Sequence, residues 1–168
     1  MCTVALNNSL PSQNLDCLRS LIGKKIVSVR RQIFKDDMDL PEFEQKGDGP
    51  VELVTSDGST LHFISQTETL SVGIVSGAMS RYGDSYEQRD VSNNSFWVDR
   101  LGEKVKQVLL LKAKSSTDQY PEEFGVELVF SNGKKVVIEY RDEEDHPDMI
   151  QVSANYTGRP CVVQKISQ

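Results

Sequence analysis

The chain has 168 residues, of which 38% are hydrophobic and 26% charged, and its formal net charge is −6. A chain of this length buries about 70% of its unfolded surface, so it needs no disulfide or metal in order to fold. The net acidity argues against general nucleic-acid binding, and it suits either a basic protein partner or plain solubility.

Residues 1–11 are expected to form a loose N-terminal arm. Apolar residues then recur on one helical face over Leu15–Ile22, which predicts a short helix. Ser12 is its expected N-cap, and Gly23 follows the last turn as a C′ residue would. Apolar and polar residues alternate over residues 25–34, which predicts a strand.

The segment Val51–Gly58, VELVTSDG, is nearly repeated as VELVFSNG at Val126–Gly133. Each copy is a strand that runs into an Asp-Gly or Asn-Gly dipeptide, which tolerates the positive φ of tight hairpin turns. A second apolar run follows each turn, so each copy predicts a β-hairpin. The likeness extends upstream, where Leu21–Val29 resembles Arg100–Val108, and we interpret the chain as an internal duplication.

A second short helix is predicted between the two hairpins, over Phe96–Leu101. Asn94 or Ser95 would cap its N-terminus, because both side chains accept hydrogen bonds from the free N–H groups of a first turn. Trp97 and Val98 would form its buried face.

The expected organisation is one compact domain with an internal repeat. Residues 1–11 form the arm, 12–76 a first αβββ repeat, 77–93 a connector, and 94–168 a second αβββ repeat with a C-terminal strand. That last strand, Cys161–Ile166, is apolar enough to dock on a sheet edge. The fold class is therefore α+β, mostly antiparallel β, with a short helix followed by a β-meander, twice.

Two glutamates occupy the same place in the two hairpins, Glu52 and Glu127. With two-residue turns, Glu52 would share a face with Phe63, and Glu127 with Ile138. Carboxylates placed alike by a duplication could converge at a pseudo-twofold axis, where they would shift each other's pKa and bind a cation or move protons. Ancestral duplication also explains the match without any function.

The connector offers a second candidate binding surface: Arg81, Tyr82, Tyr86 and Arg89. Tyrosine and arginine are among the residues that dominate interface hot spots. The alternative is an ordinary loop whose aromatic side chains fold back onto the sheets.

Catalytic and metal-binding motifs are missing from the sequence. It has no phosphate-binding glycine loop, no HExxH and no catalytic cysteine with a nearby histidine. Cys2, Cys17 and Cys161 are scattered, so they predict neither a disulfide framework nor a zinc site. Because no signal peptide or membrane-spanning run is present, we expect a cytoplasmic protein without membrane association, metal or cofactor.

The leading functional hypothesis is a non-enzymatic binding or accessory protein. One form is an acidic immunity-type protein that binds a basic protein partner, gripped by the acidic loops Asp36–Glu44 and Asp118–Glu123. The alternative is a small ligand-binding module or enzyme whose site lies at the junction of the two repeats, at Glu52 and Glu127. A third possibility is a structural subunit that oligomerises through its last strand.

Overall fold

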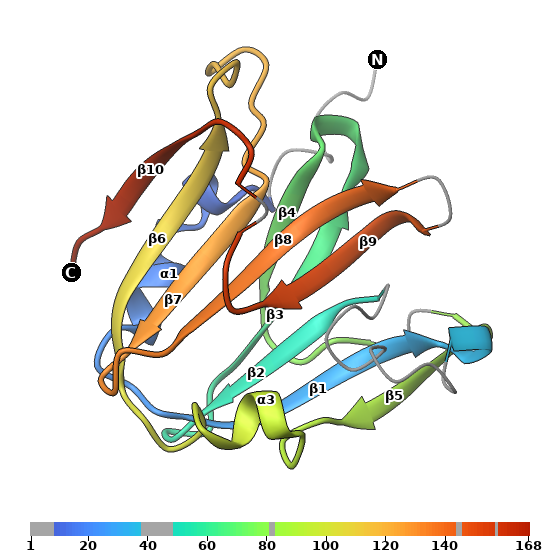
Figure 1. Cartoon of the computed structure of the whole chain (residues 1–168), viewed down its shortest axis with the longest axis vertical. Helices are drawn as coiled ribbons and strands as arrows, with labels where there is room; N and C mark the ends of the chain where they lie inside the picture. The colour runs from blue at the N-terminus through green and yellow to red at the C-terminus, as the bar shows by residue number, and fades with distance from the viewer. Residues whose placement is uncertain (1–8, 38–48, 81–82, 144–145, 157) are drawn as a thin grey trace.

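The computed structural model describes residues 9–37, 49–80, 83–143, 146–156 and 158–168. They form two antiparallel sheets of five strands each, with few and short helices (Figure 1). The predicted α+β class, dominated by antiparallel strands, is therefore confirmed.

Sheet 1 has the strand order β4-β3-β2-β1-β5. Its strands are β1 (Ile26–Phe34), β2 (Val51–Thr55), β3 (Thr60–Gln66), β4 (Ser71–Ser76) and β5 (Tyr86–Asp90). The short helices of this half are η1 (Pro11–Gln13), α1 (Leu15–Leu21), η2 (Lys35–Asp37) and η3 (Thr67–Thr69).

Sheet 2 has the order β10-β6-β7-β8-β9. Its strands are β6 (Val105–Ala113), β7 (Gly125–Phe130), β8 (Lys135–Glu143), β9 (His146–Ser153) and β10 (Cys161–Ile166), and α3 (Ser95–Val98) precedes them. Each sheet is a four-stranded meander whose fifth strand returns beside the first. The same irregularity interrupts both first strands, between Ile26 and Ser28 and between Val105 and Gln107.

The two halves meet through reciprocal backbone hydrogen bonds. Gly23 N donates to Val105 O at 2.8 Å, and Gly102 N donates to Ile26 O at 3.0 Å. Both glycines have φ near +84°, a conformation that other residues rarely adopt. Equivalent residues thus exchange equivalent bonds, as a local pseudo-twofold axis requires.

The hairpin turns are longer than the two-residue turns assumed from the sequence. Thr55 N donates to Ser59 O, so three residues lie between the paired positions, and Gly58 takes φ +84°. A three-residue turn ending in a left-handed glycine is a common hairpin connection. The change moves the register, so that Glu52 lies opposite His62 rather than beside the core residue Phe63. The face predicted for Glu52 was therefore wrong.

Glu127 is corrected in the same way. Phe130 N donates to Lys134 O, and Glu127 pairs with Val137. Val126 and Ile138 pair with each other and point into the core, so Glu127 points out of it.

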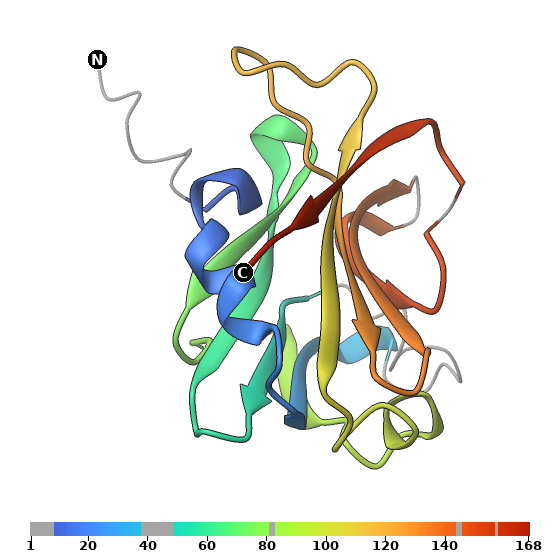
Figure 2. The same cartoon turned by 90° about the vertical axis from the view of Figure 1, so that its left-hand side faces the viewer.

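The inner faces of both sheets share one hydrophobic core. Fully buried helical side chains lie at equivalent places in the two halves, Leu18 of α1 and Trp97 of α3, and Leu21 of α1 is fully buried as well. Figure 2 shows α1 against β4 on one side and β6 and β10 on the other, which closes the space between the sheets.

The first helix begins later than the sequence suggests. Its N-cap is Asn14 and not Ser12. Ser12 lies in η1, where its backbone N–H and its hydroxyl donate to the buried carboxylate of Glu123 at 2.7 and 2.5 Å. Ser12 therefore bonds to a residue distant in the sequence and does not cap the helix.

The second helix is a single turn with Asn94 as its cap, whose Oδ1 accepts from Phe96 N at 2.7 Å. Trp97 is fully buried as predicted, but Val98 is 55% exposed. Neighbouring residues on a helix point about 100° apart, so only one of the two can face the core.

Two further segments complete the arrangement. β10 pairs with β6 along its whole length, so the predicted docking of Cys161–Ile166 on a sheet edge is confirmed. Residues 77–93, expected as a connector, contain β5 at Tyr86–Asp90, which the sequence did not predict.

Within the described ranges, no helix combines the length and the apolar character needed to cross a membrane.

Each outer face is partly covered by the chain that runs to its fifth strand. On sheet 1, Met79 is buried and its backbone N–H donates to Glu52. On sheet 2, the Arg159 guanidinium lies 3.5 Å from the centre of the Phe124 ring, above a small outer cluster with Leu111 and Val137. Figure 1 shows the connection from β9 to β10 crossing this sheet.

Candidate functional site

A row of polar side chains crosses the outer face of sheet 1. Glu52 of β2 lies opposite His62 of β3 and Arg30 of β1, and Arg30 lies opposite Asp90 of β5. The row points away from the core, because Val51 and Leu53 on either side of Glu52 point into it.

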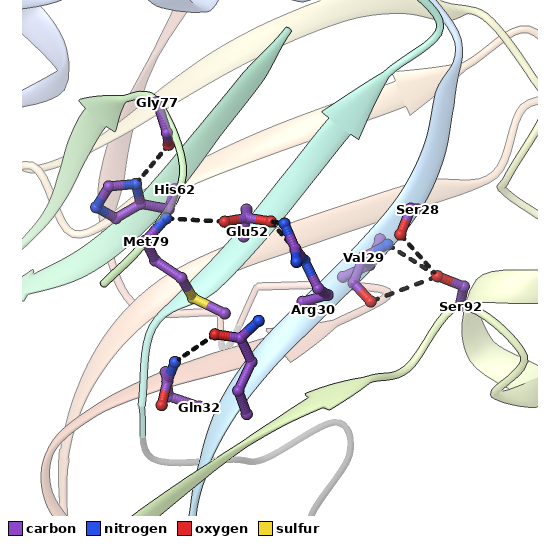
Figure 3. A network of polar contacts seen from close by, with 10 residues as sticks. Ser28, Val29, Arg30, Gln32, Glu52, His62, Gly77, Met79 and Ser92 are labelled. Carbon is purple, nitrogen blue, oxygen red and sulfur yellow. Dashed lines mark hydrogen bonds and ion pairs between the residues drawn. The ribbon is translucent and has the colours of Figure 1, made fainter. Parts of the chain in front are cut away.

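The Glu52 carboxylate is the centre of this row (Figure 3). Arg30 Nε donates to its Oε1 at 2.7 Å and the Arg30 Nη2 also contacts that oxygen, while Met79 N donates to Oε2 at 2.8 Å. The Glu52 side chain is 1% exposed and that of Arg30 36%. Both carboxylate oxygens are engaged, which makes Glu52 a positioning group for Arg30 rather than a free base.

His62 and Asp90 end the row on either side. His62 Nδ1 lies 2.8 Å from Gly77 O, so it donates its proton to that carbonyl. The pKa of Asp90 is held below its ordinary value by hydrogen bonds from the hydroxyl and the backbone N–H of Ser92, with a smaller contribution from Arg30. Asp90 is therefore an anion at neutral pH, exposed at the sheet edge.

A second polar pair lies next to the row. Gln32 Nε2 donates to Gln88 Oε1 at 3.0 Å, and Gln32 is fully buried. Its Oε1 is buried too and has no hydrogen-bond partner among the described residues. Both glutamines line a pocket of about 360 Å³ together with Lys35, Tyr86 and Glu87.

Sheet 2 carries different side chains at the same register positions. Opposite Glu127 lie Val137 and Leu109, where sheet 1 has His62 and Arg30. The pair that corresponds to Gln32 and Gln88 is Leu111 and Val163. The common topology of the two sheets does not require polar residues here, since sheet 2 has the same topology with apolar ones.

The structure does not place the site residues predicted from the sequence at one common site. Glu52 lies in the polar row and Tyr86 lines the pocket, with its ring centre 5.5 Å from that of Phe34. Arg89 alternates to the other face of β5, where its Nε lies 3.7 Å from Glu87. Arg81 and Tyr82 lie outside the described residues.

Glu127 is buried on the outer face of sheet 2, with Lys135 Nζ at 3.5 Å. The structure does not bring it together with Glu52, because both sheets and their shared core lie between the two carboxylates. They cannot act as a pair. Among the described residues, no group of three or more His, Cys, Asp or Glu side chains is placed to hold a metal ion.

Sequence reasoning missed most of this surface, including Arg30, Gln32, His62, Gln88 and Asp90. A usable signal was present in the sequence. Aligning the two halves residue by residue shows polar side chains replacing apolar ones, but the comparison needs β5 and β10 to be recognised as equivalent strands.

The two acidic loops predicted from the sequence, Asp36–Glu44 and Asp118–Glu123, differ in the burial of their carboxylates. Asp36 is exposed at the start of the first loop, and residues 38–44 lie outside the described part. In the second loop, Glu123 is buried and binds Ser12, so this carboxylate is structural, while Asp118 is exposed.

No family model, curated protein or solved structure matches the chain.

Proposed function

We propose that this chain is a binding protein that contacts a basic protein partner through the outer face of sheet 1 beside β5. The contact surface, which we call the β5 face, consists of Arg30, Gln32, Tyr86, Gln88 and Asp90, with Glu87 at the adjoining edge, where it lines the same pocket. The observation that carries the proposal is a difference between the two sheets: at matched register, Arg30, Gln32 and Gln88 of sheet 1 correspond to the apolar Leu109, Leu111 and Val163 of sheet 2.

Burial of polar groups supports a role beyond folding. A buried amide without a hydrogen bond costs about 1–3 kcal/mol in proteins. Among the described residues, the Gln32 Oε1 has no hydrogen-bond partner and carries such a cost, whereas the equivalent Leu111 of sheet 2 packs in a small apolar cluster. Sheet 2 shows that the fold does not require polar side chains at these positions. We therefore explain the polar side chains of sheet 1, which lie next to a surface pocket, by contact with a partner protein.

The charges favour a basic partner. The net charge is −6, and Asp36, Asp84, Glu87 and Asp90 are all exposed at or near β5. Lys35 N donates to Ser85 O at 2.8 Å, which holds the start of the acidic segment beside this strand. Opposite fields speed encounter, so exposed carboxylates beside this strand favour a partner that carries lysine and arginine side chains. An immunity-type protein that neutralises a basic toxin is one form of such a binder.

The test compares two variants that remove the same charge. Asp84→Asn/Glu87→Gln removes two exposed charges at the edge of the β5 face, and Asp16→Asn/Glu68→Gln removes two exposed charges elsewhere. Wild type and both variants are immobilised and exposed to lysate of the source cells. We expect wild type and the second variant to retain a basic protein that the first variant loses.

Salt provides the second readout. The retained protein should elute at about 1 M salt, where the Debye length is only about 3 Å. The proposal is overturned if all three proteins retain the same set, or if nothing with a basic composition is retained.

A further inference from the structure

The two sheets end in four edge strands, and three of these edges are protected. On β4, Ile74 N donates to Ser9 O and Val72 N donates to Glu123 O. On β9, Arg31 Nη2 donates to Ile150 O at 2.6 Å. β5 has five residues, of which three are charged. Covered backbone, short length and charge are the usual ways in which proteins prevent sheet edges from pairing with other chains.

The fourth edge, β10, is the least protected among the described residues, because no other segment covers its backbone. Its six residues, Cys161–Ile166, pair with β6 on one side only. Among the described residues, no residue outside β6 forms a hydrogen bond with this strand. Val162 and Val163 are 53% and 48% exposed, and Lys165 is the only charged residue of the strand. β10 is thus an open, largely apolar edge on an acidic protein.

We propose that β10 pairs with β10 of a second copy of this chain, antiparallel and about a twofold axis, so that sheet 2 continues across a homodimer. Antiparallel pairing of a strand with itself is self-complementary, as an isologous interface requires. Backbone hydrogen bonds supply affinity in such strand addition, and the exposed valines are buried against each other.

Charge favours a second copy over the basic partner proposed above. β10 carries one lysine and no carboxylate, so a basic protein gains nothing there, whereas two copies of this edge meet through their valines without opposed acids. β5 and β10 lie on different sides of the molecule (Figure 1), so the dimer leaves the β5 face free. The inference rests on β10 alone and is independent of the proposed function.

The experiment measures the molar mass of the full chain by light scattering across a dilution series. Val163→Lys and Val163→Glu each place a charge near the middle of β10. In an antiparallel pair the two copies of that charge lie near the axis and repel each other. Val98→Lys is the control, because Val98 is 55% exposed on α3 and lies outside the interface.

We expect wild type and Val98→Lys to be dimers, and each Val163 variant to dissociate at a concentration about tenfold higher or more. An equimolar mixture of Val163→Lys and Val163→Glu should form the mixed dimer, because the charges at the axis are then opposite. This rescue shows that both variants are folded. A monomeric wild type, or Val163 variants that dimerise as wild type does, would overturn the proposal.

Discussion

Glu52 and Glu127 occupy the same position in two copies of one hairpin, yet they point out of opposite faces of the molecule. Glu52 is held by Arg30 Nε at 2.7 Å, and the partner of Glu127 among the described residues is Lys135 Nζ at 3.5 Å. The duplication placed a glutamate in each hairpin, but the two carboxylates do not form a common site. The difference lies in the neighbouring strand, where the second copy has Leu109 at the position of Arg30.

The Arg30–Glu52 pair leads to the first prediction. Arg30→Leu should lower the free energy of unfolding by about 2 kcal/mol, because it leaves the Glu52 carboxylate buried with one partner fewer. The cost is below that of a fully buried pair, since Arg30 is 36% exposed. Arg30→Leu/Glu52→Gln removes the buried charge and keeps an acceptor for Met79 N, so it should be more stable than Arg30→Leu. Urea unfolding measures both; a double variant less stable than the single would show that the charge is not the cause.

Substitution of the Gln32–Gln88 pair should affect the stability of the protein and its binding to the partner in different ways. Gln32→Leu/Gln88→Val places the residues of sheet 2 at the same register positions of sheet 1. We expect the stability to stay unchanged or to rise by about 1 kcal/mol, because an unsatisfied buried oxygen is removed. Retention of the basic partner should fall at the same time. Thermal unfolding and the lysate assay measure the two effects, and unchanged retention would remove these glutamines from the contact surface.

Trp97 is the buried anchor of the short helix α3. Trp97→Ala should cost about 3–5 kcal/mol through the cavity it leaves. Trp97→Phe should cost only about 1 kcal/mol, because the Trp97 Nε1 is buried with no hydrogen-bond partner among the described residues. The neighbouring Val98→Ala should change stability by less than about 0.5 kcal/mol. Equal losses at positions 97 and 98, measured by denaturant unfolding, would contradict the observed burial.

Asp57 in the first hairpin turn predicts a pH dependence. Its carboxylate accepts from Lys24 Nζ at 2.8 Å, Thr55 Oγ1 at 2.6 Å and Ser59 N at 3.0 Å, and the Lys24 contact is the largest cause of a pKa well below the ordinary 3.8. The folded state therefore binds this proton less readily than the unfolded chain. The contribution of Asp57 is fully present above about pH 4 and is lost as the pH falls towards the lowered pKa.

Asp57→Asn is the matched variant, because the second copy has Asn132, whose Oδ1 accepts from Lys134 N at 3.1 Å in the same turn geometry. Wild type should be more stable than Asp57→Asn at pH 7, and the difference should shrink between pH 4 and pH 2. Melting temperatures across this range give the comparison. A difference that stays constant with pH would mean that the Asp57 charge makes no contribution.

Local signals in the sequence were enough for much of the architecture. The VELV runs, their Asp-Gly and Asn-Gly turns and the apolar spacing of Leu15–Ile22 indicate hairpins and a helix through preferences of a few neighbouring residues. Repetition of these signals indicates two similar units. β5 was missed because YEQRD has no apolar alternation, and it becomes a strand only through pairing with β1.

The site depended on contacts that local preferences do not encode. One residue in the length of the hairpin turn decides whether Glu52 faces the core or the outer surface. The polar row extends to Asp90 only because β5 returns beside β1 and places Asp90 opposite Arg30. The sequence by itself determined most of the segments that become strands and their repetition, but not β5. The tertiary structure decided which side chains meet, because register and strand order are set by packing between distant segments.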